Sequence, residues 1–532
     1  MNYRLTAFLL VPLAGLFLLF HNAAYQPLLA QGDHGRDLYA FAQTLHGQIP
    51  YHDYWWVYGP LMPYYYAMFF KIFGVAIPSV LVGKILLTVI SGVFIFFSLS
   101  LFIPPLFAFM AAMWFWMFQP DFFFTYNHIG GIACLMAMAF ALFSYIKQPK
   151  IKYLYLALFW AFVLSLIKVN FGLAALFVLI TFHKLYDRAN RIPDSKEKKN
   201  FAKIAGVFMP IWILLIYCVL LFPMPFYEIR QCMPYLSSDQ PYHSTPWESL
   251  WALGRAIAMN TYTSPANFVF ALFTIGAIII SLIKIFSPNT ARQERRQTPA
   301  AFFLLAFFYL ANLHEYVFSG VLYRSFWATP FGTMMLFLII GYAMATVSAQ
   351  IQRIVFGVLF IAVFAQYTSQ LDVIRGKKIP EQYITLERGR ITTGNPYDWF
   401  TTVERTANFL QRHVPGDETF LALPYDPLYY YLTDKTSPTR QIIFFEHINI
   451  PVEQEKKIVA SLERNKINYI LMSNRAFAVQ EPGLGVFGKT YCPVLGEYIR
   501  THFKTIATFG DWKNEPGWAW NHGTQVLERI IR

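Results

Sequence analysis

The sequence predicts a polytopic α-helical membrane protein of about eleven spans with a small α/β domain at its C-terminal end. Three observations lead to this prediction. Of the 532 residues, 56% are hydrophobic and only 14% are charged, against roughly 25% charged residues in soluble domains. The mean hydropathy is +0.39. Apolar runs close to the roughly 20 residues that a helix needs to cross a bilayer recur up to residue 370, and charged residues become frequent only after it.

The composition also excludes several classes of protein. So few charged residues are not expected of a soluble enzyme or a disordered chain, and the four cysteines form neither a disulfide framework nor a zinc pattern. Cys232 and Cys492 could be free or paired. The net charge of +13 would suggest nucleic acid in a soluble protein. Here the basic residues cluster in short loops between apolar runs, so membrane orientation explains them and no nucleic-acid partner is expected.

Eleven apolar runs are the candidate spans, and they divide the chain into a membrane domain at 1–370 and a second domain at 371–532. The first run follows Arg4 as in a signal peptide but lacks a small-residue cleavage site, so we expect an uncleaved anchor. The two runs that flank Lys168 could instead form one long broken helix. The runs are 5–21, 78–102, 104–119, 130–146, 153–168, 170–183, 201–222, 266–286, 300–318, 327–348 and 350–369.

The lysines and arginines predict which way the spans point. With the N-terminus in the cytoplasm, the loops rich in Lys and Arg all fall on the cytoplasmic side, and the aromatic loops poor in positive charge all fall on the other side. An odd number of spans then places 371–532 outside the cytoplasm, on the periplasmic or extracellular face of a cell (inner) membrane. The basic loops lie at 147–152, 184–199, 284–296 and 353, and the aromatic loops at 22–77, 120–129, 223–265 and 314–326.

The segment 371–532 differs in pattern from the membrane domain. Its apolar runs are shorter, and helical periodicity alternates with short buried runs that are typical of strands. Such alternation predicts a small extracytoplasmic α/β domain. The expected helices are 398–413 and 452–465, and the expected strands are 418–423, 441–445 and 468–473.

Ionisable groups gather in the first external loop, residues 22–77. Such a loop is ordinarily a solvated segment with an interfacial aromatic belt. Here, however, Asp33 and Asp37 precede an amphipathic stretch at 38–46 that could lie on the membrane and hold Asp33 over a cavity. The informative segments are Gly32-Asp33-His34-Gly35-Arg36-Asp37-Leu38-Tyr39-Ala40, Gly47-Gln48-Ile49-Pro50-Tyr51-His52-Asp53 and Tyr58-Gly59-Pro60-Leu61.

The pattern Asp-x-Gly-x-x-Leu-Tyr-x-x-Ala, followed by Gly-x-x-Pro-Tyr-x-Asp and Gly-Pro-Leu, resembles the first periplasmic loop of the C-type (GT-C) membrane glycosyltransferases. Within them it is most similar to the protein O-mannosyltransferases and the lipid A aminoarabinose transferases (glycosyltransferase families 39 and 83). The resemblance implies a GT-C fold, a catalytic loop at 22–77, a polyprenyl-phosphate-linked sugar as donor, and inversion at the anomeric carbon. Asp33 occupies the family's catalytic acidic position. The family often has Asp-Glu there, whereas this chain has Asp33-His34, so no second carboxylate is implied.

The chemistry of such a transfer needs one carboxylate and some positive charge. An acceptor hydroxyl, on a lipid, a glycan or a protein, must lose its proton as it attacks, and Asp33 could take it as general base. The leaving phosphate needs cations, for which Lys168 and Arg324 are the candidates. Lys168 stands in an apolar region where an unpaired ammonium is costly. The alternatives are that Lys168 snorkels to the headgroups and that Arg324 is an interfacial anchor.

Several polar and aromatic side chains are candidate substrate contacts of lower rank. Glu315 could orient a sugar hydroxyl or pair with Arg324. A divalent metal ion held by Asp33, Asp121 and His128 is conceivable, although ligand spacing across loops cannot be inferred from the sequence. The loop 223–265 could be a mobile cover or a passive interfacial segment. The candidate contacts are Asp37, Tyr39, Tyr58, Asp121, His128 and Glu315.

Two alternative interpretations compete with this one. Residues 483–490, Gly-Leu-Gly-Val-Phe-Gly-Lys-Thr, match a phosphate-binding P-loop, but Pro482 precedes them where a strand should end, and Pro493 stands where the helix should form its first turns. We therefore expect an external loop. A transporter or flippase for polyprenyl lipids or polysaccharides would also place charge in the membrane. Against it, no inverted repeat is evident in the hydropathy.

Overall fold

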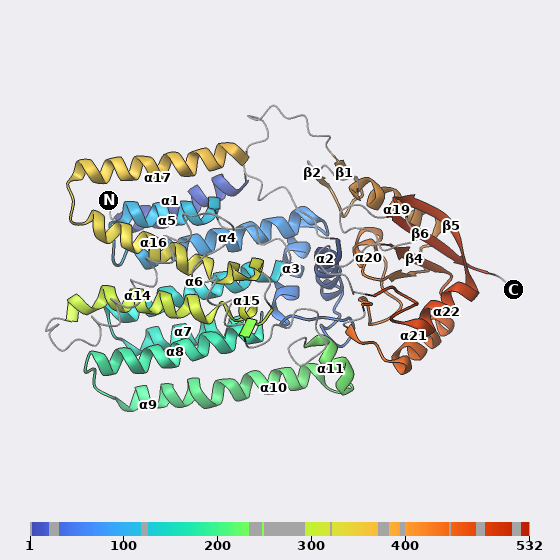
Figure 1. Ribbon diagram of the computed structural model, residues 1–532, viewed down its shortest axis with the longest axis horizontal. Coiled ribbons are helices and arrows are strands. Elements are labelled where there is room, and N and C mark those ends of the chain that lie inside the picture. The colour runs from blue at the N-terminus through green and yellow to red at the C-terminus, as the bar shows by residue number, and fades with distance from the viewer. Residues whose placement is uncertain are drawn as a thin grey trace.

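The computed structural model is elongated, with a bundle of helices that carries an α/β region at one end (Figure 1). The N-terminal end of α1 lies at the opposite end of the bundle from the α/β region, as Figure 1 shows. The structure describes residues 3–20, 31–118, 126–233, 247–248, 293–319, 322–370, 382–393, 399–445, 448–474, 485–512 and 523–530.

Ten of the eleven predicted spans correspond to helices in the described part of the chain, and the eleventh, 266–286, lies outside it. Six of these helices are long and apolar enough to cross a membrane, so the chain is a multi-pass membrane protein. The helices are α1 (Tyr3–Phe20), α4 (Ile77–Leu99), α5 (Pro105–Phe118), α6 (Tyr126–Lys147), α7 (Ile151–Ser165), α8 (Val169–Ala189), the continuous α9 (Lys196–Lys203), η2 (Ile204–Phe208) and α10 (Met209–Leu221), α14 (Gln293–Ala311), α16 (Thr329–Met344) and α17 (Ala349–Gln370).

Burial separates the central helices of the bundle from the peripheral ones. Almost every residue of α6 is buried among its neighbours, whereas α17 leaves Val358, Ile361 and other apolar side chains exposed. A helix that is apolar all round is stable only in a protein core or in lipid. α6 therefore forms the core of the bundle, and the outer surface of α17 is suited to lipid.

Lys168 marks the junction between two spans rather than a break within one. Its backbone is extended, α7 ends before it and α8 begins after it, and the two helices lie side by side (Figure 1). Gly172 permits their close approach, because a Cβ there would lie 2.4 Å from the Ser165 Cα. The alternative of a single broken helix is therefore wrong.

The first external loop is more ordered than the sequence predicted. Instead of an amphipathic stretch limited to 38–46, a helix α2 extends over Gln31–Leu45, and a second helix α3 covers Leu61–Phe73. Asp33 and Asp37 therefore lie on a helix and not in the loop before it. α2 is buried between the membrane helices and the C-terminal region.

The C-terminal region contains a four-stranded mixed sheet in the order β3-β4-β6-β5. β3 and β4 are parallel, and the remaining neighbours are antiparallel. Successive side chains of a strand point to opposite faces. In β3, Phe420 and Ala422 join the core shared with the membrane helices, while Leu421 and Leu423 pack under α21 and α22. The strands are β3 (Phe420–Leu423), β4 (Tyr469–Ser473), β5 (Phe503–Gly510) and β6 (Gly523–Arg529).

The remaining C-terminal elements cover both faces of this sheet. α19 (Trp399–His413) and α20 (Leu428–Thr433) lie toward the membrane helices, and α21 (Val452–Arg464) and α22 (Pro493–His502) lie on the other face. A hairpin of β1 (Gln382–Ile384) and β2 (Ile391–Thr393) packs beside α19. In its turn, the Arg388 carbonyl accepts a hydrogen bond of 3.0 Å from the Ile77 amide at the start of α4. The sheet region is thus attached to the bundle at several points.

Two details of the predicted C-terminal elements are corrected. Residues 441–445 are buried but form no strand, because a buried apolar run can also be irregular chain. α22 begins at Pro493, which is favourable because the first residue of a helix needs no amide hydrogen. Residues 485–492 nevertheless form no P-loop: they make a turn in which the Thr490 hydroxyl accepts from the Val486 amide at 2.8 Å.

Candidate active site

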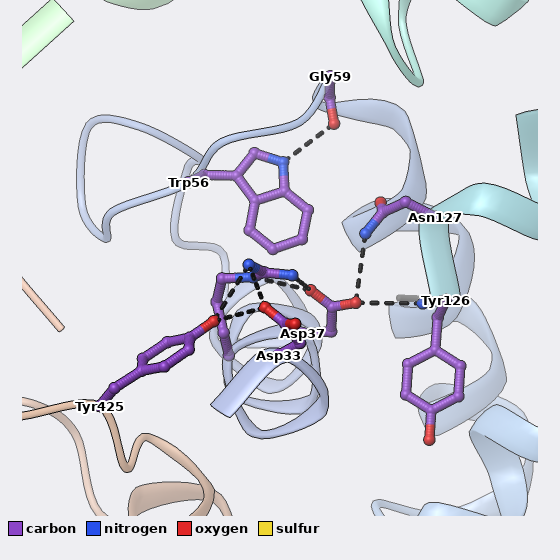
Figure 2. Close-up of polar contacts among 8 residues, drawn as sticks. Asp33, Asp37, Trp56, Gly59, Tyr126, Asn127 and Tyr425 are labelled. Atoms are coloured by element: carbon purple, nitrogen blue, oxygen red, sulfur yellow. Dashed lines mark hydrogen bonds and ion pairs between the residues drawn. The ribbon is translucent and has the colours of Figure 1, made fainter. Parts of the chain in front are cut away.

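Three ionisable side chains of α2 form the centre of the site (Figure 2). Residues three and four apart lie on the same face of a helix, so Arg36 and Asp37 both lie on the face of Asp33, and the long Arg36 side chain reaches both carboxylates. Its Nε and Nη2 donate to Asp37 Oδ1 at 3.0 and 2.9 Å, and its Nη1 donates to Asp33 Oδ1 at 3.0 Å. One buried guanidinium therefore holds two carboxylates in place.

Asp37 is fully buried and ties α2 to the start of α6. Its Oδ2 accepts from the Tyr126 amide at 3.2 Å and from Asn127 Nδ2 at 3.3 Å. Burial raises the pKa of the Asp37 carboxyl from 3.8 to about 7, although Arg36 opposes the shift. With both oxygens occupied and no exposed surface, Asp37 is placed to orient Arg36 rather than to meet a substrate.

Asp33 differs from Asp37 in its access to solvent. Its side chain is 26% exposed, and its Oδ1 accepts a second hydrogen bond, of 2.8 Å, from the hydroxyl of Tyr425. Arg36 Nη1 also donates to the Tyr425 oxygen at 3.2 Å. Tyr425 follows β3 in the C-terminal region, so this region contributes directly to the site (Figure 2).

Aromatic rings enclose the cation of Arg36. The Arg36 guanidinium lies 5.0 Å from the ring centre of Tyr58 and 5.8 Å from that of Trp56. Trp56 is fixed by a hydrogen bond of 3.0 Å from its Nε1 to the Gly59 carbonyl. Gly59 in turn lies against the turn that precedes Lys168, since its amide donates to the Ile167 carbonyl at 2.8 Å. The first external loop thereby connects the α2 carboxylates to Lys168.

Lys168 forms an ion pair with a carboxylate, and this contact decides whether its side chain is buried or extends to the lipid headgroups. Its Nζ lies 2.5 Å from Glu315 Oε1, and the two side chains are only 9% and 3% exposed. Glu315 begins α15 (His314–Ser319) together with His314 and accepts from Asn170 Nδ2 at 3.1 Å. Lys168 is therefore a buried member of an ion pair and does not extend to the headgroups.

The surroundings of this ion pair include a second cation and several rings. Arg324, half-buried in the 3₁₀-helix η4 (Leu322–Trp327), acts electrostatically on Glu315. The Lys168 ammonium lies 5.5 Å from the ring centre of Tyr58 and 5.4 Å from that of Trp327. Tyr58 is thus close to both Arg36 and Lys168, which makes it the link between the two charged groups.

Two further predicted contacts occupy less accessible positions. The His128 ring is surrounded by Tyr58, Phe326 and Trp327, with ring centres 5.7, 5.0 and 5.2 Å away. Tyr39 is buried against the C-terminal region, where its hydroxyl accepts from the Ser437 amide at 3.0 Å. Tyr39 therefore packs between the membrane helices and the C-terminal region.

The metal hypothesis stays a prediction. Asp121 lies outside the described residues, as does most of the loop 223–265. Among the residues that the structure describes, no group of three or more His, Cys, Asp or Glu side chains converges on one point. Asp33 accepts from Arg36 and Tyr425, and the His128 ring packs against Tyr58 and Phe326.

Sequence reasoning missed two members of the site. Arg36 was part of the loop motif but was not ranked as a site residue, although its position three residues after Asp33 on a helix was a usable signal. Tyr425 was missed because nothing in its local sequence connects it with a residue 392 positions away.

The helical membrane bundle with its attached α/β region has the GT-C fold, as comparison with solved structures shows. Among solved structures, the chain is similar to ArnT from Cupriavidus metallidurans bound to undecaprenyl phosphate, with a TM-score of 0.53 and 9% sequence identity over 99% of this chain and 98% of that one. It is also similar to the oligosaccharyltransferase of Archaeoglobus fulgidus in complex with Zn and sulfate, with a TM-score of 0.52 and 10% identity over 87% of this chain and 68% of that one. No protein-family model matches the chain, and no curated protein sequence does.

Proposed function

We propose that the protein is an integral membrane glycosyltransferase that moves a sugar from a polyprenyl-phosphate donor to an acceptor hydroxyl at the external membrane face. The observation that carries the proposal is Asp33, a partly exposed carboxylate held by Arg36 at the end of the bundle where the C-terminal region attaches. The fold supports it, since one protein with this fold, ArnT, binds undecaprenyl phosphate. The acceptor belongs to a lipid, a glycan or a protein.

In the proposed reaction, Asp33 acts as general base. The acceptor O–H gives its proton to the Asp33 carboxylate while the acceptor oxygen forms a bond to the anomeric carbon. The bond between that carbon and the phosphate oxygen breaks, and the lipid phosphate leaves with the electron pair. A single positioned base is worth roughly 10²–10⁴-fold in rate.

The leaving phosphate would meet the positive side of the site. Lys168 and Arg324 both act on the carboxylate of Glu315, and the Lys168 ammonium lies beside Tyr58. Cations that are preorganised where negative charge develops stabilise the transition state without reorganising. We propose the surroundings of these two cations as the phosphate-binding region, with Tyr58 and His128 forming its aromatic wall.

The arrangement of the bundle supports the predicted orientation. The basic connections between α6 and α7 and between α8 and α9 lie at the end of the bundle away from the α/β region (Figure 1). Basic loops favour the cytoplasmic side. We therefore propose a cytoplasmic N-terminus, an extracytoplasmic C-terminal region from about residue 371, and a site at the external face, where a lipid-linked donor and an envelope acceptor would meet.

The test compares wild type with Asp33→Asn in nanodiscs, using a panel of radiolabelled undecaprenyl-phosphate-linked sugars and a crude envelope extract as acceptor. The amide keeps the size of the carboxylate and can still accept from Arg36, but it cannot take a proton. Wild type should transfer sugar or slowly hydrolyse donor, and D33N should lose roughly 10²–10⁴-fold in rate while it still binds donor. Asp417→Asn, at an exposed position before β3, is the matched control and should keep full activity.

Other outcomes would point elsewhere. Equal activity of D33N and wild type would exclude Asp33 as the base. If no donor is consumed by either protein, yet proteoliposomes move the labelled lipid across the bilayer, the protein is a flippase rather than a transferase.

A further inference from the structure

Tyr425 lies at the edge of the sheet that contacts α2. It is the second residue after β3, and β4 is parallel to β3, so the carboxyl ends of both strands lie at the same edge. In open α/β sheets the loops at this edge commonly carry the groups that contact ligands. Here the loop after β3 reaches the first turns of α2 (Figure 2).

The direction of each hydrogen bond in the cluster can be assigned. A guanidinium only donates, so Arg36 Nη1 donates to the Tyr425 oxygen, 3.2 Å away. The single phenolic proton is then directed to Asp33 Oδ1, 2.8 Å away. Burial raises the pKa of the Tyr425 hydroxyl well above its usual range, so the phenol keeps this proton at any working pH.

The two oxygens of Asp33 are consequently unequal. Oδ1 accepts from both Arg36 and Tyr425, whereas within the described residues no donor contacts Oδ2. Two donors on one oxygen restrain the rotation of the carboxylate about its last torsion, which is otherwise broad. Oδ2 is the atom left to accept a proton from outside the cluster.

We propose that Tyr425 is a positioning residue, which fixes the Asp33 carboxylate so that Oδ2 faces the acceptor hydroxyl and makes the C-terminal region an obligatory part of the site. This inference rests on the proposed function, in which Asp33 is the base. A base must lie within hydrogen-bond reach of the proton it removes, and small displacements of a positioned group are costly in rate.

The packing between α2 and the C-terminal region holds Tyr425 in place. Gly35 lies directly against α20, where a Cβ would come within 2.6 Å of the Leu428 amide nitrogen. The Trp55 amide donates to the Arg440 carbonyl at 2.9 Å, and Arg440 Nη1 donates to the Tyr51 carbonyl at 3.0 Å. Contacts on both sides of the cluster thus set the position of the loop that carries Tyr425.

The experiment uses the full chain in nanodiscs with whichever undecaprenyl-phosphate-linked sugar wild type consumes. Tyr425→Phe removes one oxygen and keeps the ring. A hydrogen bond to a charged group supports an expected fall in kcat of roughly tenfold or more, with the donor KM within about twofold because the phosphate region is untouched. Tyr431→Phe, which removes a buried hydroxyl of α20 that donates to the Arg388 carbonyl, is the matched control and should keep kcat.

A second variant covers the case in which Y425F folds poorly. Tyr425→His keeps a ring with an N–H donor, so its kcat should lie between those of Y425F and wild type. Thermal unfolding of all variants separates loss of fold from loss of rate.

The outcomes distinguish the inference from the proposed function. If D33N is inactive while Y425F and Y425H keep the kcat of wild type within about twofold, Asp33 is still the base and the positioning role of Tyr425 is refuted. An equal fall in kcat for Y425F and Y431F would also refute it, because the effect would then be a general one on the C-terminal region. If wild type transfers no sugar, the proposed function and the inference fail together.

Discussion

The buried ion pair of Lys168 and Glu315 leads to an asymmetric prediction. Breaking a buried pair by removing one partner typically costs about 3–5 kcal/mol, because the other charge is left uncompensated. The two single variants should nevertheless differ. In Lys168→Met, the carboxylate of Glu315 keeps the Asn170 hydrogen bond and the nearby charge of Arg324. In Glu315→Gln, the Lys168 ammonium loses its anionic partner and keeps a neutral amide oxygen and the faces of aromatic rings.

We therefore expect E315Q to lie near the upper end of this range and K168M near the lower end. The double variant removes both charges and should be more stable than E315Q, with a coupling energy of about 2 kcal/mol or more from the double-mutant cycle. The assay is thermal unfolding of the purified protein in one detergent, with the apparent Tm of all four proteins measured at one scan rate. Additive effects, or a K168M variant less stable than E315Q, would refute this account of the pair.

The same set of variants separates a structural role of Lys168 from phosphate binding. If Lys168 only holds the turn between α7 and α8, the double variant regains donor binding together with stability. If Lys168 also contacts the phosphate, the double variant regains stability alone. Binding of radiolabelled undecaprenyl-phosphate-linked sugar to the four proteins distinguishes the two results.

Two further predictions concern α2. Gly35→Ala places a Cβ 2.6 Å from the Leu428 nitrogen, so overpacking should destabilise the protein by about 1–3 kcal/mol and separate Asp33 from Tyr425. The apparent Tm and the transfer rate should both fall, whereas Gly416→Ala, with open space around its Cβ, should change neither. For Asp37, the raised pKa of about 7 means that the folded chain holds this proton more tightly than the unfolded chain, so wild type should lose stability as the pH rises from about 4 to about 7. The Tm of Asp37→Asn relative to that of wild type should accordingly increase from pH 5 to pH 8, and a difference that stays constant would contradict the shift.

Much of the fold follows from local properties of the sequence. Whether a run of residues is stable in lipid depends on the composition of that run, so the predicted extents of α4 and α5 agree with the structure to within a few residues. The helix α19 and the strands β3 and β4 follow from periodicity in the same way. The strands β5 and β6 were not predicted: much of β5 is exposed and lacks a buried apolar run, and β6 mixes polar with apolar residues, although most of it is buried against its neighbours.

The candidate site was predicted only in part. The loop motif identified Asp33 and its resemblance to a catalytic position, and the cost of a charge in an apolar region identified Lys168. Whether Glu315 pairs with Lys168 or with Arg324 was beyond the sequence, since both cations were expected near the same membrane face. The structure assigns Glu315 to Lys168 because the turn after α7 and the start of α15 meet there.

By itself, then, the sequence determined that this is a multi-pass membrane protein and where most of its spans lie. Those are properties of single segments, and they depend on transfer between water and lipid. Only the tertiary structure placed Tyr425 on Asp33 across 392 positions of the chain and made the C-terminal region part of the site. Such contacts depend on how helices and sheet pack against one another, and no short stretch of sequence encodes that packing.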